Sequence, residues 1–196
     1  MRILCLIVAT LVLAGLCGAA GGMSPTIEVS YPNYLLPGSF ASFRNMNLEE
    51  SDAVILGEKG RIALKAHLHK GRYEVQRKDS SDWLRLNWVK FPKSESAEPE
   101  NGVAYFDWVS TGASASDFGV VQVLQVNDGR IEIVQQIFFN TRGSRKAVAV
   151  LDPETNALTI TGVHGWECCK DQLDVVRFRF EGGRFKRISY RTIPLS

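Results

Sequence analysis

From Arg61 onward, apolar and polar residues alternate with a period of two, the pattern of a half-buried β-strand. The apolar positions that share one face are Ile62, Leu64, Ala66 and Leu68. A turn at Lys70-Gly71 leads into a second predicted strand, Tyr73–Gln76. A third predicted strand, Trp83–Phe91, keeps its phase until Val89, where the alternation slips as it does at a β-bulge.

The second half of the chain predicts three hairpins, preceded by a mostly apolar strand at Val103–Val109. The paired strands of these hairpins are Val120–Val126 with Arg130–Phe139, Ala147–Leu151 with Ala157–Val163, and Leu173–Phe180 with Arg184–Arg191. The first turn contains Asp128-Gly129, the strongest short-range hairpin signal. In the strand after it, the alternating apolar positions, expected on one face, are Ile131, Ile133, Ile137 and Phe139.

Successive hairpins predict a mainly β fold, an antiparallel meander that closes as a barrel or folds into a sandwich. The sequence does not choose between these two. The β domain is expected to span residues 61–196, with a turn-rich segment, residues 21–60, packing on it. In that segment Asn47 and Glu50 have the spacing of a capping pair and predict a short helix through Ile55. At most this one short helix is expected outside the leader.

Residues 1–20 have the features of a secretory signal peptide. A basic start is followed by an apolar run, Ile3–Leu16, which is short for a membrane span, and by small residues that favour cleavage after Ala20. The chain is therefore expected to be exported to the periplasm or outside the cell. The alternative is lipid anchoring at Cys17. However, Leu16 occupies the position before the cysteine, where lipoprotein signals have a small residue.

Cleavage would leave a chain of nearly balanced charge. Of 23 basic residues only Arg2 is lost, which leaves 22 against 21 acidic residues and a net charge of +1. Nucleic acid is not expected as a partner, because its phosphates demand a strong basic excess. No second long apolar run follows, so no membrane span is expected after cleavage.

The stretch Val163–Lys170 carries His164, Trp166, Glu167 and the adjacent pair Cys168-Cys169, the only cysteines left after cleavage. Consecutive Cα atoms lie about 3.8 Å apart, less than the roughly 4.4–6.8 Å of ordinary disulfides, so a bridge between them is strained. Export favours this vicinal disulfide. Two thiols, a metal site and a bridge to a second chain remain alternatives.

Other candidate chemistry is weaker. His67 and His69 leave the same face of a strand and suit zinc if a third ligand joins them, although two polar residues on the wet side are the better interpretation. A Gly-x-Ser-x-Gly elbow and a phosphate-binding glycine loop are both missing from the sequence. A pair of carboxylates for glycoside hydrolysis remains open among Asp107, Glu132 and Asp174.

Aromatic residues favour a binding function. Trp166, set in a loop, is expected to be exposed, and with Trp83, Trp88, Trp108 and Tyr105 it would form a platform for a sugar, a peptide or a lipid. The alternative is that most of these rings fill the core. The core is the favoured place for Trp108, which shares one face of a strand with Phe106.

Several segments resemble a group of uncharacterised exported bacterial domains that are rich in hairpins. The segments that carry the resemblance are Leu68–Glu74, Val121–Val123 with Asn127–Gly129, Leu151–Pro153 with Leu158–Ile160, Gly165–Cys169 and Leu173–Phe180. It implies a Cys-Cys pair before the final hairpin and carries no activity with it. Some of these domains have an Asp-rich loop similar to that of calcium-binding propeller blades. The corresponding residues 93–102 lack that pattern, so calcium is not expected.

These observations favour an exported, non-catalytic domain, binding or structural, whose partner is an unknown small ligand or an envelope protein. Trp166, His164 and Glu167 are the expected binding residues, Cys168 and Cys169 the expected disulfide, and no cofactor is expected. The alternative is a redox-active or metal-dependent enzyme that uses the His164–Cys169 loop.

Overall fold

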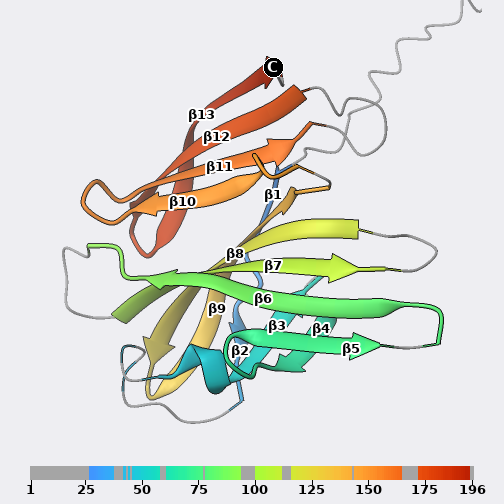
Figure 1. The fold of residues 1–196 in the computed structure, drawn as a ribbon. Coiled ribbons are helices and arrows are strands. Elements are labelled where there is room, and N and C mark those ends of the chain that lie inside the picture. The colour runs from blue at the N-terminus through green and yellow to red at the C-terminus, as the bar shows by residue number, and fades with distance from the viewer. Residues whose placement is uncertain are drawn as a thin grey trace, which may run out of the picture.

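A computed structural model describes residues 27–37, 42, 44, 46–57, 61–76, 78–93, 100–111, 116–142, 144–164 and 172–194. This part of the chain forms three antiparallel sheets, which stack in layers and do not close into a barrel (Figure 1). The predicted mainly β, antiparallel fold is confirmed, in its open rather than its barrel form. Among the described residues, none of the helices has the length and apolar character needed to cross a bilayer.

The largest sheet forms the middle layer and has seven strands. They are, in spatial order, β1 (Ile27–Ser30), β9 (Arg130–Asn140), β8 (Ser116–Asn127), β7 (Glu100–Ser110), β6 (Ser81–Lys90) and β5 (Arg72–Gln76), with β2 (Tyr34–Leu35) also paired to β9. Asp128 and Gly129, at φ values of 50° and 72°, make the tight turn between β8 and β9, as the two-residue hairpin requires. A bulge is present in β6 as predicted, but it lies between Leu86 and Trp88, before the predicted position at Val89. The prediction that Trp88 shares the face of Leu84 and Leu86 is therefore wrong, because the bulge reverses the side-chain phase before Trp88.

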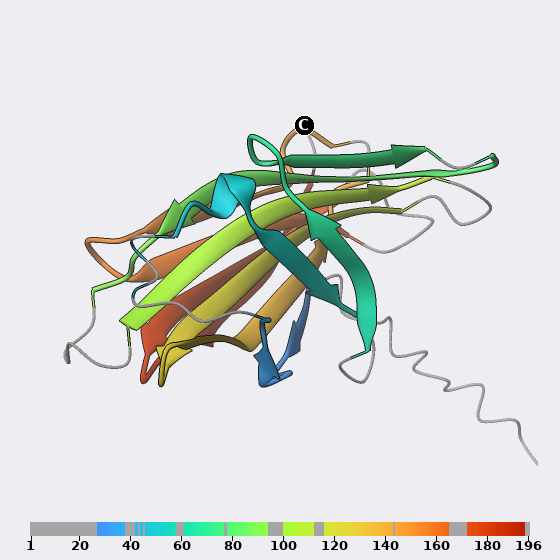
Figure 2. The ribbon, with the colours of Figure 1, turned by 90° about the horizontal axis from the view of Figure 1, so that it is seen from below.

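Two smaller sheets cover opposite faces of the large sheet, and each contact buries its own core. The strands concerned are β3 (Asp52–Leu56) and β4 (Ile62–His67) on one side, and β10 (Val148–Asp152), β11 (Ala157–Val163), β12 (Gln172–Glu181) and β13 (Arg184–Pro194) on the other. The β3–β4 pair crosses the large sheet obliquely (Figure 2). Large apolar side chains such as Ile55 and Phe178 close the two cores at 0% and 1% exposure.

The segment before β4 is only partly helical. Leu48–Glu50 form one turn of 3-10 helix, capped by Asn47, whose side-chain oxygen accepts from the backbone N–H of Glu49 at 3.2 Å. The predicted helix through Ile55 is wrong, because Asp52–Leu56 is the strand β3. Its last four residues are all buried, so both faces of the segment meet apolar neighbours, whereas a short surface helix would bury one stripe only.

Strand β9 departs from the expected alternation. Its pairing with β8 shifts by one residue, so that Val134 stands opposite no partner. Ile131 and Ile133 therefore face the β3–β4 core, whereas Ile137 and Phe139 face the other core. The prediction that these four share one face is wrong, because a bulge reverses the side-chain phase from that point on.

Two neighbouring glutamines of β9, which follow the bulge, point their side chains to opposite faces of the large sheet, as successive strand residues do. Gln136 donates to the backbone oxygen of Leu56 at 2.6 Å and accepts from its N–H at 3.2 Å. Gln135 donates to the oxygen of Phe185 at 2.9 Å and accepts from its N–H at 2.7 Å. Both glutamines are fully buried. Each side chain forms, with one backbone N–H and one backbone oxygen of a covering sheet, the hydrogen bonds that a neighbouring strand would otherwise form.

Candidate ligand-binding cleft

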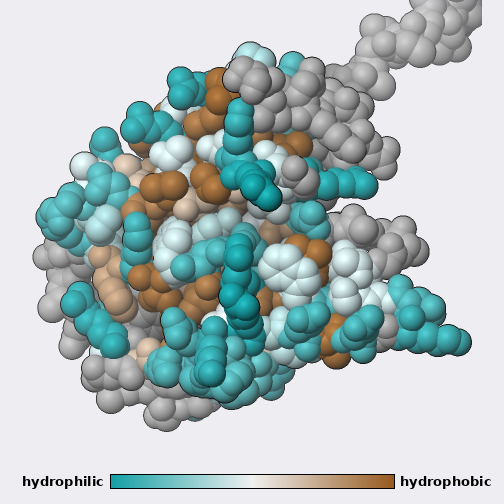
Figure 3. All heavy atoms as spheres, in the orientation of Figure 1, coloured by the Kyte–Doolittle hydropathy of each residue, from teal (hydrophilic) through white to brown (hydrophobic). Residues whose placement is uncertain are grey.

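A cleft of about 850 Å³ opens between the large sheet and β10, the edge strand of the four-stranded sheet. It exists because the four-stranded sheet covers only one part of that face. Val103 of β7 lies in the core beneath it, Tyr105 belongs both to that core and to the lining, and Asp107 and Val109 farther along the same strand line the cleft. In Figure 3 hydrophobic and hydrophilic residues are interspersed on the side of the molecule that this cleft faces.

The floor of the cleft comes from residues on one face of β6 and β7, where the bulge of β6 brings Trp88 to the same face as Trp83 and Arg85. Trp83, Arg85 and Trp88 of β6 lie opposite Val109, Asp107 and Tyr105 of β7 in the paired register. Because side chains of cross-strand neighbours project to the same face, this register brings two indoles, a phenol and an ion pair together. The Trp88 and Tyr105 rings pack with their centroids 5.6 Å apart.

The wall of the cleft is the outer edge of β10. Two backbone oxygens of that edge accept hydrogen bonds from β6 side chains: Trp88 Nε1 donates to Ala149 at 3.2 Å, and Lys90 Nζ donates to Leu151 at 2.6 Å. The ammonium of Lys90 also lies 5.4 Å from the Trp88 ring centroid, a cation–π distance. These contacts fix the wall against the floor and cap an edge that would otherwise offer free acceptors.

A charged pair occupies the floor. Arg85 Nη2 contacts Asp107 Oδ2 at 2.5 Å, and the hydroxyl of Tyr105 donates to Asp107 Oδ1 at 2.8 Å. Burial, followed by the neighbouring Asp107 carboxylate, raises the pKa of Tyr105 above its usual value, so the phenol stays a neutral donor. The Arg85 side chain is half exposed, and its other guanidinium N–H groups have no partner among the described residues. It therefore offers donors to the cleft.

A second polar cluster lies on β11–β13, next to residues 165–171, which include the two adjacent cysteines and lie outside the described part of the chain. Asp174 Oδ1, in a fully buried side chain, accepts from Tyr190 and Thr192 at 2.8 Å each and pairs with His164 Nδ1 at 2.8 Å. The Thr192 hydroxyl lowers the pKa of Tyr190, but burial and Asp174 together outweigh it and raise that pKa. The carboxylate orients the ring of His164, one of the predicted site residues, which is about one-fifth exposed.

The other residues predicted in that loop lie outside the described part of the chain. Trp166, Glu167, Cys168 and Cys169 belong to this undescribed segment, so their predicted roles in binding and in a disulfide stay predictions. Within the described residues, the structure holds no group of three or more His, Cys, Asp or Glu side chains suited to a metal ion.

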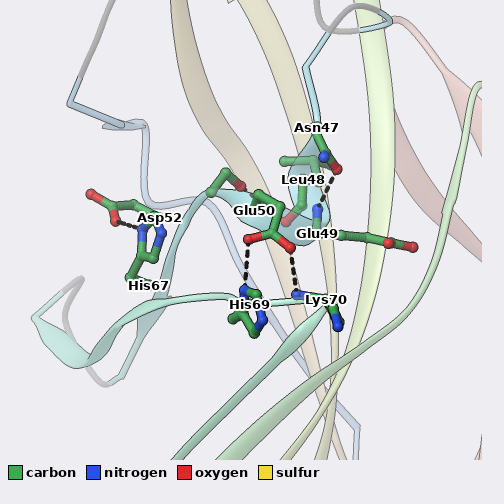
Figure 4. A network of polar contacts seen from close by, with 9 residues as sticks. Asn47, Leu48, Glu49, Glu50, Asp52, His67, His69 and Lys70 are labelled. Carbon is green, nitrogen blue, oxygen red and sulfur yellow. Dashed lines mark hydrogen bonds and ion pairs between the residues drawn. The ribbon is translucent and has the colours of Figure 1, made fainter.

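The two histidines of the His-x-His pair are exposed, and each has its own carboxylate partner (Figure 4). His67 Nδ1 lies 2.9 Å from Asp52, its cross-strand neighbour, and His69 Nδ1 lies 3.0 Å from Glu50. Glu50 also accepts from the backbone N–H of Lys70, and this hydrogen bond, followed by the one from His69, lowers its pKa. The predicted wet-side position is confirmed. The contact of His67 joins β4 to β3, whereas that of His69 joins the turn after β4 to the 3-10 turn.

The three carboxylates considered for hydrolysis do not share partners. Asp107 bonds with Arg85 and Tyr105, Asp174 belongs to the His164 cluster, and Glu132 accepts from Asn127 at 3.3 Å in the β8–β9 hairpin.

The aromatic residues divide between the two faces of the large sheet. Trp83, Trp88 and Tyr105 line the cleft, whereas Phe106 is buried in the β3–β4 core, with Trp108 packed against it, as favoured for both. Sequence reasoning missed the contributions of Arg85 and of the β10 edge. The signal for Arg85 was present, because it is two residues from Trp83 on a predicted strand.

Neither a family model, nor a curated protein, nor a solved structure matches this chain. Its function therefore has to be argued from its own residues.

Proposed function

We propose that the protein is an exported, non-catalytic domain that binds a small ligand in the cleft between β6–β7 and β10. The observation that carries the proposal is that Trp83, Trp88 and Tyr105 line one cleft together with the Arg85–Asp107 pair. Small-ligand sites are concave and mostly apolar, with a few placed polar groups, and this cleft has that composition. Export rests on the signal-peptide pattern of residues 1–20.

The bonding of Asp107 supports binding rather than catalysis. Both of its oxygens are already engaged, Oδ1 by Tyr105 and Oδ2 by Arg85. A general base has to take up a proton from substrate, and Asp107 would first have to lose one of these partners. A fixed acceptor next to a half-exposed guanidinium suits recognition of a polar ligand.

Titration of the mature protein with a panel of short sugars, peptides and fatty acids, followed by NMR, tests this proposal. We expect at least one class to shift the resonances of Trp83, Arg85 and Asp107 and of few residues elsewhere. The shifts should weaken in a Trp83→Ala variant and persist in Tyr31→Ala, which removes a ring that is 54% exposed outside the cleft. Shifts confined to another surface, or no shift with any class, would refute the proposal.

The second candidate function is a redox-active or metal-dependent enzyme that uses the His164–Cys169 loop. The observation in its favour is the His164–Asp174 contact, since an oriented imidazole is common both to metal ligands and to activated nucleophiles. Alkylation and mass spectrometry test this candidate, because the predicted vicinal disulfide would keep Cys168 and Cys169 protected until reductant is added. Two rapidly alkylated thiols, or bound metal that is lost in His164→Ala, would favour the enzyme instead.

A further inference from the structure

We propose that the ligand of the cleft is a neutral carbohydrate, a short stretch of oligosaccharide whose ring faces stack on Trp83 and whose hydroxyls bond to the Arg85–Asp107 pair. This inference rests on the proposed binding function and narrows it to one ligand chemistry. It follows from what the cleft offers to each kind of occupant.

A sugar ring presents a C–H face and, around it, hydroxyls that both donate and accept. The floor of the cleft matches both properties. Trp83 is a partly exposed indole between its cross-strand neighbour Val109 and Arg85, two residues along β6. An aromatic side chain of this kind gives a large apolar contact at little cost in conformational entropy. Arg85 and Asp107, in direct contact, place a donor and an acceptor side by side next to that ring.

An extended peptide fits this cleft less well. Peptides that bind beside an edge strand do so by pairing with its free backbone groups. On β10 the backbone oxygens of Ala149 and Leu151 already accept from Trp88 and Lys90. An added strand would have to displace both side chains.

An alkyl chain and an anionic ligand also fit less well. An alkyl chain lying on the floor would strip water from the Arg85–Asp107 pair without replacing its hydrogen bonds, and removing hydration from charged groups is costly. An anion would meet Arg85 already neutralised by Asp107. The other two basic residues on the lining, Lys90 and Arg145, are partly balanced by Asp117, and Lys90 already donates to the backbone oxygen of Leu151. A neutral ligand that carries hydroxyls incurs neither cost.

Calorimetry with neutral oligosaccharides of glucose and of N-acetylglucosamine, together with intrinsic tryptophan fluorescence, tests the inference. We expect saturable binding to at least one of them, accompanied by a change in fluorescence because Trp83 and Trp88 line the site. Doubling the ionic strength should leave the affinity unchanged, since no net charge is recognised. Loss of the stacking ring in Trp83→Ala should weaken binding about tenfold or more, and Trp83→Phe should recover part of it.

Arg85→Met provides a second variant, which removes the donors and keeps a flexible apolar stem. It should weaken sugar binding about tenfold as well, because two hydroxyl contacts are lost. Trp108→Phe, on the opposite face, should bind as the parent does. Thermal unfolding confirms that each variant is folded before its affinity is compared.

The outcomes separate the two levels of the proposal. If a peptide or a fatty acid binds with shifts at Trp83 and Arg85 while no neutral oligosaccharide does, the cleft is a binding site and the carbohydrate inference is wrong. Binding of an anionic polymer that weakens steeply with salt would overturn it in the same way. If nothing binds in the cleft, the proposed function fails together with the inference.

Discussion

Gln136→Met is expected to lower the free energy of unfolding by about 4 kcal/mol, a large share of the stability of a domain of this size. The Gln136 side chain bonds to both backbone groups of Leu56, which is itself 1% exposed. Methionine fills a similar volume but offers no matching donor or acceptor. The N–H and C=O of Leu56 would then be buried without partners, at about 1–3 kcal/mol each.

Neighbouring polar groups do not compensate for this loss. Gln122 donates to Gln136 at 2.7 Å and, from the same nitrogen, to the backbone oxygen of Val54 at 2.7 Å. In the Gln136→Met variant, Gln122 keeps its hydrogen bond to the oxygen of Val54 and loses the one to residue 136. Together these two side chains satisfy three backbone groups of β3, the N–H and oxygen of Leu56 and the oxygen of Val54, so they join β3 to the large sheet.

Urea-induced unfolding, followed by tryptophan fluorescence, measures the effect. Gln76→Met is the matched control, since Gln76 is exposed on the edge strand β5 and its replacement should change stability by no more than about 0.5 kcal/mol. Gln135→Met should lower the stability by a similar amount, because it leaves the backbone N–H and oxygen of Phe185 without the partner that they have in Gln135. A loss below about 1 kcal/mol for Gln136→Met would show that the amide pairing does not hold the layers together.

The contacts of these glutamines are a part of the fold that could not be predicted from the sequence. Local pattern was enough for the hairpins, because turns such as Asp128-Gly129 and period-two alternation are encoded in a few neighbouring residues. The role of Gln136 is not local. It depends on the bulge at Val134, which reverses the phase of β9, and on Leu56, which lies 80 residues away in the chain. In sequence Gln136, a polar residue directly before Ile137, resembles a solvent-facing residue.

Only part of the cleft could be predicted from the sequence, because only its floor depends on local alternation. Trp83, Trp88 and Tyr105 are recognisable as candidates, and their side of the sheet follows from alternation once the register of β6 and β7 is known. The wall is not predictable in this way, because it requires that β10 lie above β6, a packing of two sheets. Trp108 has a second feature that depends on packing. Its indole nitrogen is buried and has no hydrogen-bond partner in the described structure, which no pattern of neighbours would indicate.

Gly119→Ala is the second substitution expected to have a large effect, a loss of about 3 kcal/mol or more in unfolding free energy. Gly119 lies directly opposite Phe139 in the β8–β9 pairing. A Cβ built on it would stand 2.0 Å from Cζ of that ring and 2.4 Å from both Cε atoms. The ring has little room to move, since Phe139 is 1% exposed and its ring packs against that of Tyr105.

A double-mutant cycle with Phe139→Leu tests whether this clash is the cause. Phe139→Leu alone should cost about 1–2 kcal/mol through lost packing, and in its presence Gly119→Ala should cost far less than in the parent. Additive losses would mean that the glycine matters for another reason, such as backbone conformation. The control is Gly57→Ala, whose new Cβ would approach only the Cβ of Ala63 closely, at 3.3 Å.

The effect of Gly119→Ala should reach the cleft. The Phe139 ring stacks on Tyr105, with centroids 5.8 Å apart, and the Tyr105 hydroxyl donates to Asp107. A methyl group that pushes Phe139 away therefore shifts the residue that orients the carboxylate of the cleft. In a variant that stays folded, we expect altered NMR resonances for Asp107 and Arg85 and weaker ligand binding, both recovered when Phe139→Leu removes the clash. Unchanged cleft resonances in the destabilised variant would show that the core and the cleft are not coupled through Tyr105.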